Sequence, residues 1–206
     1  MAWRATAVRP RTGLPGRERN HRARASDETE EQVMSSFYLR TTQHLAAPLP
    51  EVFEFFSKAS NLGEITPGWL KFQILTEGDP PMRVGLLLDY KISMRGIPMR
   101  WQSEISRWDP PHVFVDEQRK GPYSKWHHTH EFRADGDTTW VIDTVQYASI
   151  GGALVNKLFL EPQLKQIFGH RTKVIGEKFG DASEPKVELL GANRPAPVQP
   201  AEALAQ

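Results

Sequence analysis

The sequence predicts an α+β fold in which a curved antiparallel sheet of seven strands wraps around one long C-terminal helix. A strand-like segment that begins at residue 37 is followed at once by a helix with an apolar face. Six further strand-like segments, separated by turn residues, fill residues 70–149. After Gly151 and Gly152 the apolar residues repeat with a helical period, which predicts the C-terminal helix.

The first predicted elements are a strand and two short helices. The segment FYLRTTQHLA at 37–46 alternates aromatic and β-branched residues with polar ones, as strands do. Residues 48–62 predict a helix, because Pro50 suits a first turn and the apolar residues recur at helical spacing. Residues 62–70 predict a second short helix or turn, which Pro67 interrupts.

Six strand-like segments then follow in close succession. Turn-forming residues separate them, and Asp135-Gly136 between the last two is a strong hairpin signal. Strands joined by short turns pair with their neighbours in the chain, so we expect an antiparallel meander. The segments cover residues 70–77, 84–94, 99–109, 112–120, 125–134 and 138–149.

The last predicted element is a helix over residues 161–179, preceded by a shorter helical segment at 153–160. Pro162 is suited to the first turn of the long helix. A single helix does not easily fill the concave side of a seven-stranded sheet, so we expect an internal cavity. One stripe of this helix carries Leu164, Phe168, Arg171, Ile175 and Phe179.

The two ends of the chain differ in composition from the rest. Residues 1–34 predict a disordered basic leader, since its first 33 residues carry seven arginines and few apolar residues. A transit peptide, a nucleic-acid arm and an appended start are all open for this leader. Residues 181–206 are rich in Pro and Ala and predict a disordered tail. The predicted ligand-binding domain therefore covers residues 35–180.

Composition and charge exclude several functions. Residues 34–206 hold 19 basic and 20 acidic residues, so we expect no nucleic-acid partner. The absence of cysteine excludes disulfides, thiolate nucleophiles and cysteine-based metal sites. The apolar runs fall far short of the roughly 20 residues that cross a bilayer, so we expect a soluble, cytoplasmic protein without stable membrane insertion. The sequence does not indicate an oligomeric state.

The segment WHHTHEF at 126–132 carries the most distinctive polar residues. Alternate residues of a strand point to opposite faces, so Trp126, His128, His130 and Phe132 share one face. The two aromatic residues indicate that this face points inward. His127 belongs to the opposite face and is expected to contact solvent.

Neighbouring strands supply partners for these histidines. The hairpin places Asp143 opposite His128 or, after a two-residue shift, opposite His130, and both registers direct it inward. On the other side, Asp116 is expected beside His128, with Gln118 on the same face. Together with Arg171 of the last helix, these residues predict a polar cluster within an aromatic surround.

Three interpretations of this cluster remain open. It is a buried hydrogen-bonded network, a set of groups that orients the polar end of an apolar ligand, or a catalytic or zinc site. A His–Asp pair can act as a general base, and the catalytic candidates are His128, His130 and Asp143. A zinc site needs a third well-placed ligand, so no metal and no other cofactor is predicted.

Four segments resemble the START-like superfamily, also called Bet v 1-like or SRPBCC, and within it a bacterial subgroup. They are VFEFFSKASNLGEITP at 52–67, GIPMRWQSEI at 96–105, FVDEQRKGPYSKWHHTHEF at 114–132 and IFGHR at 167–171. The resemblance covers about residues 36–180 and implies the helix-grip fold. Similar proteins include polyketide cyclase/dehydrase and coenzyme Q-binding START-domain types.

We therefore expect the protein to bind a hydrophobic or lipid-like small molecule between the sheet and the C-terminal helix. The alternative is a cofactor-independent cyclase/dehydrase-type enzyme that uses a His–Asp pair, and a third possibility is a quinone-handling or membrane-interface module. The residues expected to contact the ligand are Trp101, Asp116, Gln118, Trp126, His128, His130, Phe132, Asp143, Phe168 and Arg171.

Overall fold

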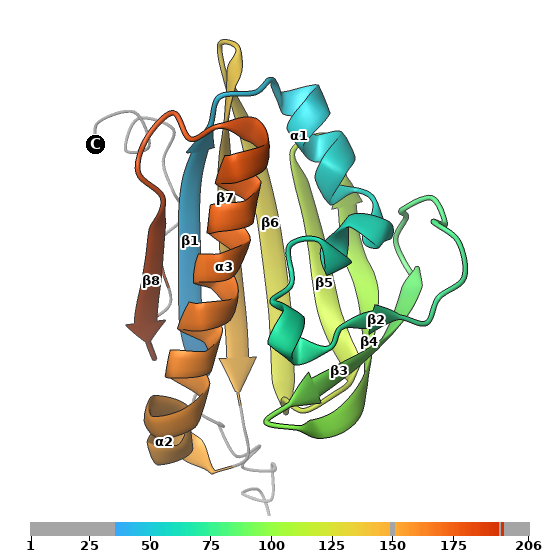
Figure 1. Cartoon of the computed structure of the whole chain (residues 1–206), viewed down its shortest axis with the longest axis vertical. Coiled ribbons are helices and arrows are strands. Elements are labelled where there is room, and N and C mark those ends of the chain that lie inside the picture. The colour runs from blue at the N-terminus through green and yellow to red at the C-terminus, as the bar shows by residue number, and fades with distance from the viewer. Residues whose placement is uncertain (1–35, 149–150, 194, 196–206) are drawn as a thin grey trace, which may run out of the picture. The chain divides into compact units, whose positions relative to one another are not determined.

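The structure is a computed structural model, and it describes residues 36–148, 151–193 and 195 (Figure 1). The predicted leader at 1–34 lies outside the described residues. In chain order the elements are β1 (Phe37–Leu45), α1 (Leu49–Phe56), η1 (Ala59–Gly63), η2 (Gly68–Leu70), β2 (Gln73–Ile74), β3 (Leu87–Met94), β4 (Ile97–Asp109), β5 (Val113–Lys120), β6 (Lys125–Asp135), β7 (Thr138–Ala148), α2 (Gly152–Val155), η3 (Asn156–Leu160), α3 (Glu161–Phe179) and β8 (Lys186–Gly191).

The strands of the described part form one antiparallel sheet in the order β2-β3-β4-β5-β6-β7-β1-β8. The meander from β3 to β7 confirms the predicted hairpins, and β1 closes on β7 with Leu39 opposite Val145. The predicted α+β class, with a sheet covered by a long C-terminal helix, is confirmed. In Figure 1, α3 crosses the face of the sheet beside α1.

The sheet has eight strands where seven were expected, and the difference lies at its edges. The prediction of a disordered tail from residue 181 is wrong for β8, which pairs with the outer edge of β1 and places Leu189 opposite Leu39. Val187 and Leu189 pack against the core. This strand alternates over only a few residues after Pro185, too short a pattern to distinguish it from a tail.

At the other edge, β2 is shorter than the expected strand at 70–77. The turn η2 holds residues 68–70, and Lys71 follows it in the left-handed conformation with φ 46°. Extended backbone can therefore begin only beyond Lys71. The regular ladder ends after Ile74, because the N–H groups of Leu75 and Thr76 both donate to the carbonyl of Asp89. The first predicted helix, expected to reach residue 62, ends at Phe56, and the 3-10 turn η1 follows it. Of the expected second helix or turn at 62–70, the 3-10 turn η2 is present.

The core lies between the sheet and the helices. The apolar face of α1 packs Phe53 and Phe56 edge-on against Phe132 of β6, with ring centroids 5.2 and 5.0 Å away. On α3, the predicted stripe is confirmed for Leu164, Phe168 and Ile175, which are buried. Its Arg171 lies at the margin of the stripe, because Thr172 takes the buried position beside it.

No helix in the described ranges combines the length and the apolar character that a membrane span requires.

Replacing Phe132 by alanine is expected to lower the free energy of unfolding by about 3–5 kcal/mol, because this ring is 1% exposed and packed by three other phenylalanines. The matched control is Ile97→Ala, at a side chain that is 62% exposed, where the change should stay within about 0.5 kcal/mol. Urea unfolding measures both variants. Similar losses in the two would contradict this packing.

Candidate functional site

The register of three strands assembles the polar cluster. In the hairpin of β6 and β7, His130 lies opposite Asp143, and His128 lies opposite Val145. The shifted register is thus confirmed, and the one with Asp143 opposite His128 is wrong. The two strands stay paired up to Asp135 and Thr138, on either side of a two-residue loop. Asp143 points inward, as both registers required.

Strand β5 contributes the second carboxylate. Asp116 is paired with His128, as predicted, and Phe114 is paired with His130. The rings of Phe114 and His130 stack with centroids 4.1 Å apart, which fixes the plane of the imidazole. Asp116 lies deep in the fold, and 20% of its side chain stays accessible along the cavity that it lines.

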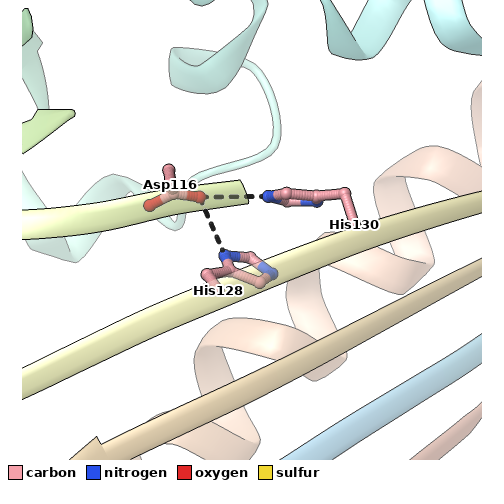
Figure 2. Close-up of side chains that lie close together, drawn as sticks. All are labelled: Asp116, His128 and His130. Atoms are coloured by element: carbon pink, nitrogen blue, oxygen red, sulfur yellow. Dashed lines mark hydrogen bonds and ion pairs between the residues drawn. The ribbon is translucent and has the colours of Figure 1, made fainter. Parts of the chain in front are cut away.

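Two carboxylates bracket both imidazoles. Nε2 of His130 lies 3.1 Å from Oδ2 of Asp116, and its Nδ1 lies 2.6 Å from Oδ1 of Asp143. For His128, Nδ1 is 3.4 Å from the same Asp116 oxygen, and Nε2 is 3.5 Å from the same Asp143 oxygen. Figure 2 shows both rings directed at a single oxygen of Asp116. Both histidine side chains and that of Asp143 are at least 96% buried.

These contacts differ in quality. His130 makes an aligned hydrogen bond with Asp116. Within the described residues, Oδ1 of Asp143, Nε2 of His128 and Nδ1 of His130 have no aligned hydrogen-bond partner, so their close approach is an electrostatic contact. The other Asp143 oxygen accepts a bond of 3.4 Å from the hydroxyl of Thr41.

The surroundings of the two histidines shift their pKa values in opposite directions. Burial opposes protonation of His130, but the charge of Asp143 and the contacts with both carboxylates outweigh it and raise the pKa. Burial and the neighbouring charge of His130 lower the pKa of His128 to about 4. Although burial alone would raise them, the pKa values of Asp116 and Asp143 are lowered, chiefly by His130. His130 therefore holds a proton more tightly than His128, whose imidazole is neutral near pH 7.

Because their pKa values shift in opposite directions, the two histidines stabilise the folded state in different pH ranges. The contribution of His130 is complete below the ordinary pKa of 6.5 and is lost as the pH rises through its raised value. The contribution of His128 is present above 6.5 and is lost as the pH falls toward about 4. The carboxylates contribute stability above their ordinary pKa of 3.8, and lose it in more acidic solution.

Arg171 adds a positive charge from α3. Its guanidinium lies 5.9 and 6.0 Å from the ring centroids of Phe56 and Phe168. The charge contributes to the lowered pKa of both Asp116 and Asp143. When His130 is protonated, its imidazolium and the guanidinium of Arg171 balance the two carboxylates.

A cavity of about 180 Å³ lies between the sheet, α1, the 3-10 turns and α3, and the cluster forms part of its wall. Much of the remaining wall is apolar, with Leu88, Ile92, Ile105 and Ile167 among its residues. Of the residues expected to contact a ligand, those that line the cavity are Trp101, Asp116, Trp126, His128, His130, Phe168 and Arg171.

Three expected residues do not line this cavity. The amide of Gln118 turns toward the following loop, where Nε2 donates to the carbonyl of Tyr123 over 2.6 Å. Phe132 belongs to the packed core under α1. Asp143 lies behind the two imidazoles, which separate it from the cavity. The alternation of a strand predicts which side of the sheet a side chain faces. It does not predict which of the inward side chains line the cavity.

Other lining residues were not singled out from the sequence. The main ones are Leu88, Tyr90 and Ile92 of β3, whose alternation with Leu87, Asp89 and Lys91 is visible in the sequence. Tyr123, in the loop between β5 and β6, also reaches the cavity and is 6% exposed. Burial raises the pKa of Tyr90, and the charge of Asp116 adds to the effect, so this phenol keeps its proton.

A double-mutant cycle on His130→Gln and Asp143→Asn tests the buried pair. Each single change is expected to cost roughly 3–5 kcal/mol of unfolding free energy, because it leaves a buried charge without its partner. The double variant should lose less than the sum, with a coupling of about 1–3 kcal/mol. Urea unfolding in EDTA measures all three proteins.

The control is the exposed pair Glu54 and Lys58, whose charged atoms are 2.7 Å apart. Its coupling should be much smaller, because water screens it. Equal coupling in the two pairs would contradict the electrostatic account.

Solved structures with a similar fold come from bacteria and plants. The Zhui aromatase/cyclase from Streptomyces sp. R1128 is 18% identical with a TM-score of 0.54, and the alignment covers 69% of this chain and 93% of that one. Ginseng major latex-like protein 151 from Panax ginseng is 14% identical with a TM-score of 0.54, covering 70% and 98%. Norcoclaurine synthase from Thalictrum flavum, a point mutant in complex with a transition-state analogue, is 17% identical with a TM-score of 0.51, covering 69% and 96%.

These identities show a shared fold and no more, and a search of curated protein sequences gives no match. A family profile, described as polyketide cyclase / dehydrase and lipid transport, matches residues 45–172. This match spans more than half of the chain. It includes the two histidines and the two carboxylates of the cluster, namely Asp116, His128, His130 and Asp143. The chain belongs to the polyketide cyclase/dehydrase and lipid transport family.

Proposed function

We propose that the protein binds a hydrophobic small molecule in the cavity between its sheet and α3, with the polar end of that molecule directed at Asp116 and His128. The observation that carries this proposal is the composition of the wall, which combines aliphatic and aromatic side chains with one group of polar residues. Small-molecule sites are usually built in this way. Membership of a family described by cyclase, dehydrase and lipid transport activities supports it.

The size of the cavity limits the ligand. At about 180 Å³ it resembles an engineered apolar cavity of roughly 150 Å³ that holds one benzene molecule. The part of the ligand that is enclosed is therefore close to one substituted ring. Each methylene transferred from water contributes about 0.8 kcal/mol to binding. A longer lipid chain fits only when the wall moves outward.

The polar groups at the wall favour a ligand with a hydroxyl or carbonyl group. Asp116 accepts hydrogen bonds, and the protonated phenol of Tyr90 donates one. Ser103 already receives the indole N–H of Trp101 over 3.0 Å, so its own proton is available to Asp116 or to a ligand. Matching such groups to a ring substituent gives selectivity over an unsubstituted ring.

Catalysis of the cyclase/dehydrase type is a second candidate, favoured by one observation. Protonated His130 and ionised Asp116 share a hydrogen bond at the cavity wall, which places an acid and a base beside the enclosed molecule. An enzyme of this type loses turnover and keeps ligand affinity when His130 is replaced by glutamine. A protein that only binds its ligand has no turnover to lose.

Filling the cavity should abolish binding of a one-ring probe. Leu88 is 3% exposed and lines the cavity, and Leu87 beside it is 44% exposed on the other face of the strand. With phenol as the probe, Leu88→Phe is expected to weaken affinity by more than roughly tenfold, whereas Leu87→Phe leaves it unchanged. Shifts of the isoleucine methyl resonances on titration report the binding.

Thermal melting first establishes that both variants are folded. Equal phenol affinity in the two variants, or no methyl shift in the unmodified protein, would count against this cavity as the binding site.

A further inference from the structure

We propose that Asp116, His128 and His130 form a binding site for a divalent first-row transition metal ion of the Zn²⁺ type, with a free coordination position toward the cavity. From the sequence, the acids expected beside the two histidines could equally be their salt-bridge partners, so no metal was predicted. The register of β5 and β6 supplies the third ligand, because it holds Asp116 against both imidazoles.

The ligand atoms have separations that suit such an ion. One possible ligand atom from each of Asp116, His128 and His130 lies within 4.8 Å of the other two. Nδ1 of His128 and Nε2 of His130 are 3.4 and 3.1 Å from the same Asp116 oxygen. In a tetrahedral site with bonds of roughly 2.0–2.1 Å, neighbouring ligand atoms are about 3.3 Å apart. Small rotations of these side chains therefore admit the ion.

The far side of both imidazoles is arranged as in known metal centres. Histidine ligands usually direct their second nitrogen to a carboxylate, which orients the ring and strengthens its bond to the metal. Here Oδ1 of Asp143 lies 2.6 Å from Nδ1 of His130 and 3.5 Å from Nε2 of His128. One buried carboxylate oxygen is thus in electrostatic contact with the outer nitrogens of both rings, and the inner nitrogens remain for the ion.

A hydrogen-bonded network alone leaves His128 poorly satisfied. Neutral imidazole has one N–H donor and one nitrogen lone pair. Both nitrogens of His128 face carboxylate oxygens, at 3.4 and 3.5 Å, so one lone pair is directed at an anion. A cation between His128 and Asp116 converts this repulsion into two bonds. It also replaces the proton of His130 as the partner of two buried carboxylates.

The ligand set selects the kind of ion. Two imidazoles and one carboxylate suit zinc and iron, whereas calcium and magnesium prefer sites built from oxygen ligands. Three protein ligands leave at least one coordination position, and the cavity is the open space beside it. The site is independent of the proposed hydrophobic ligand, although an oxygen of such a ligand can occupy that position.

The test uses the full chain, prepared without a polyhistidine tag and stripped with a chelator. Zn²⁺ is titrated calorimetrically, and Co²⁺ is titrated by visible absorption. We expect saturation at about one ion per chain, and Co²⁺ bands of a four- or five-coordinate site that excess Mg²⁺ does not remove. Less than about 0.1 ion per chain, or displacement by Mg²⁺, overturns the proposal.

Variants locate the ion. Asp116→Asn and His128→Gln are each expected to weaken Zn²⁺ binding by more than roughly tenfold, and Asp143→Asn by about 10–100-fold. The matched control is His127→Gln, at the neighbouring residue on the opposite strand face, where its ring contacts Glu117. Unchanged affinity in the first two variants, or an equal loss in the control, overturns the proposal.

If a variant fails to fold, the site of Zn²⁺ binding can still be located on the unmodified chain. Zn²⁺ should shift the ring ¹⁵N resonances of His128 and His130 and leave those of His127 in place, and unshifted rings in the first two overturn the proposal. Phenol affinity of the metal-free protein is measured separately. A failed metal site leaves that affinity intact, whereas a failed cavity removes it and leaves Zn²⁺ binding.

Discussion

The electrostatic contact of His130 with two buried carboxylates is the constraint on which the site depends. Asp116 and Asp143 come from strands on either side of β6, and both approach one imidazole, at 3.1 and 2.6 Å. Neither acid is tolerable in the fold without a positive partner, since isolated buried charges are costly. The register of β5, β6 and β7 is therefore linked to the charge of one histidine. A one-residue shift of either neighbouring strand would separate the charges and turn inward residues outward.

The cavity takes its polar character from the same arrangement. Asp143 is held behind the rings, and Asp116 and His128 meet the open space, so the cluster presents only part of its charge to a bound molecule. Aromatic and aliphatic residues of β3, β4 and α3 enclose the rest. The polar groups are consequently fixed before any ligand arrives, which lowers the entropic cost of selecting a polar ring substituent. The proposed ligand site and the proposed metal site share this preorganised wall.

Local patterns in the sequence predicted the order of elements and the face of most site residues. The alternation in WHHTHEF separated His127 from the inward pair, and the distances confirm that pair's contact with Asp116. Register was less accessible, because Asp135-Gly136 marks the hairpin and leaves a two-residue ambiguity that only packing resolves. The sequence also did not predict which inward side chains reach the cavity. Phe132 and Gln118 share a face with site residues but lie away from the cavity. Strand β8 was missed because its pairing with β1, more than its own short pattern, makes it a strand.

His128 and His130, neighbours on one face of β6, should differ in their protonation states. Spectra of the ¹⁵N resonances of both imidazoles, recorded as a function of pH, measure this difference directly. In chelator-treated protein at pH 6.5, which equals the ordinary pKa of histidine, His130 should carry protons on both ring nitrogens. It should lose one of them only in more alkaline solution. His128 should remain neutral until the pH approaches about 4. The variant His128→Gln assigns the second signal. Protonation of His128 near 6.5, or a neutral His130 at that pH, would contradict the account.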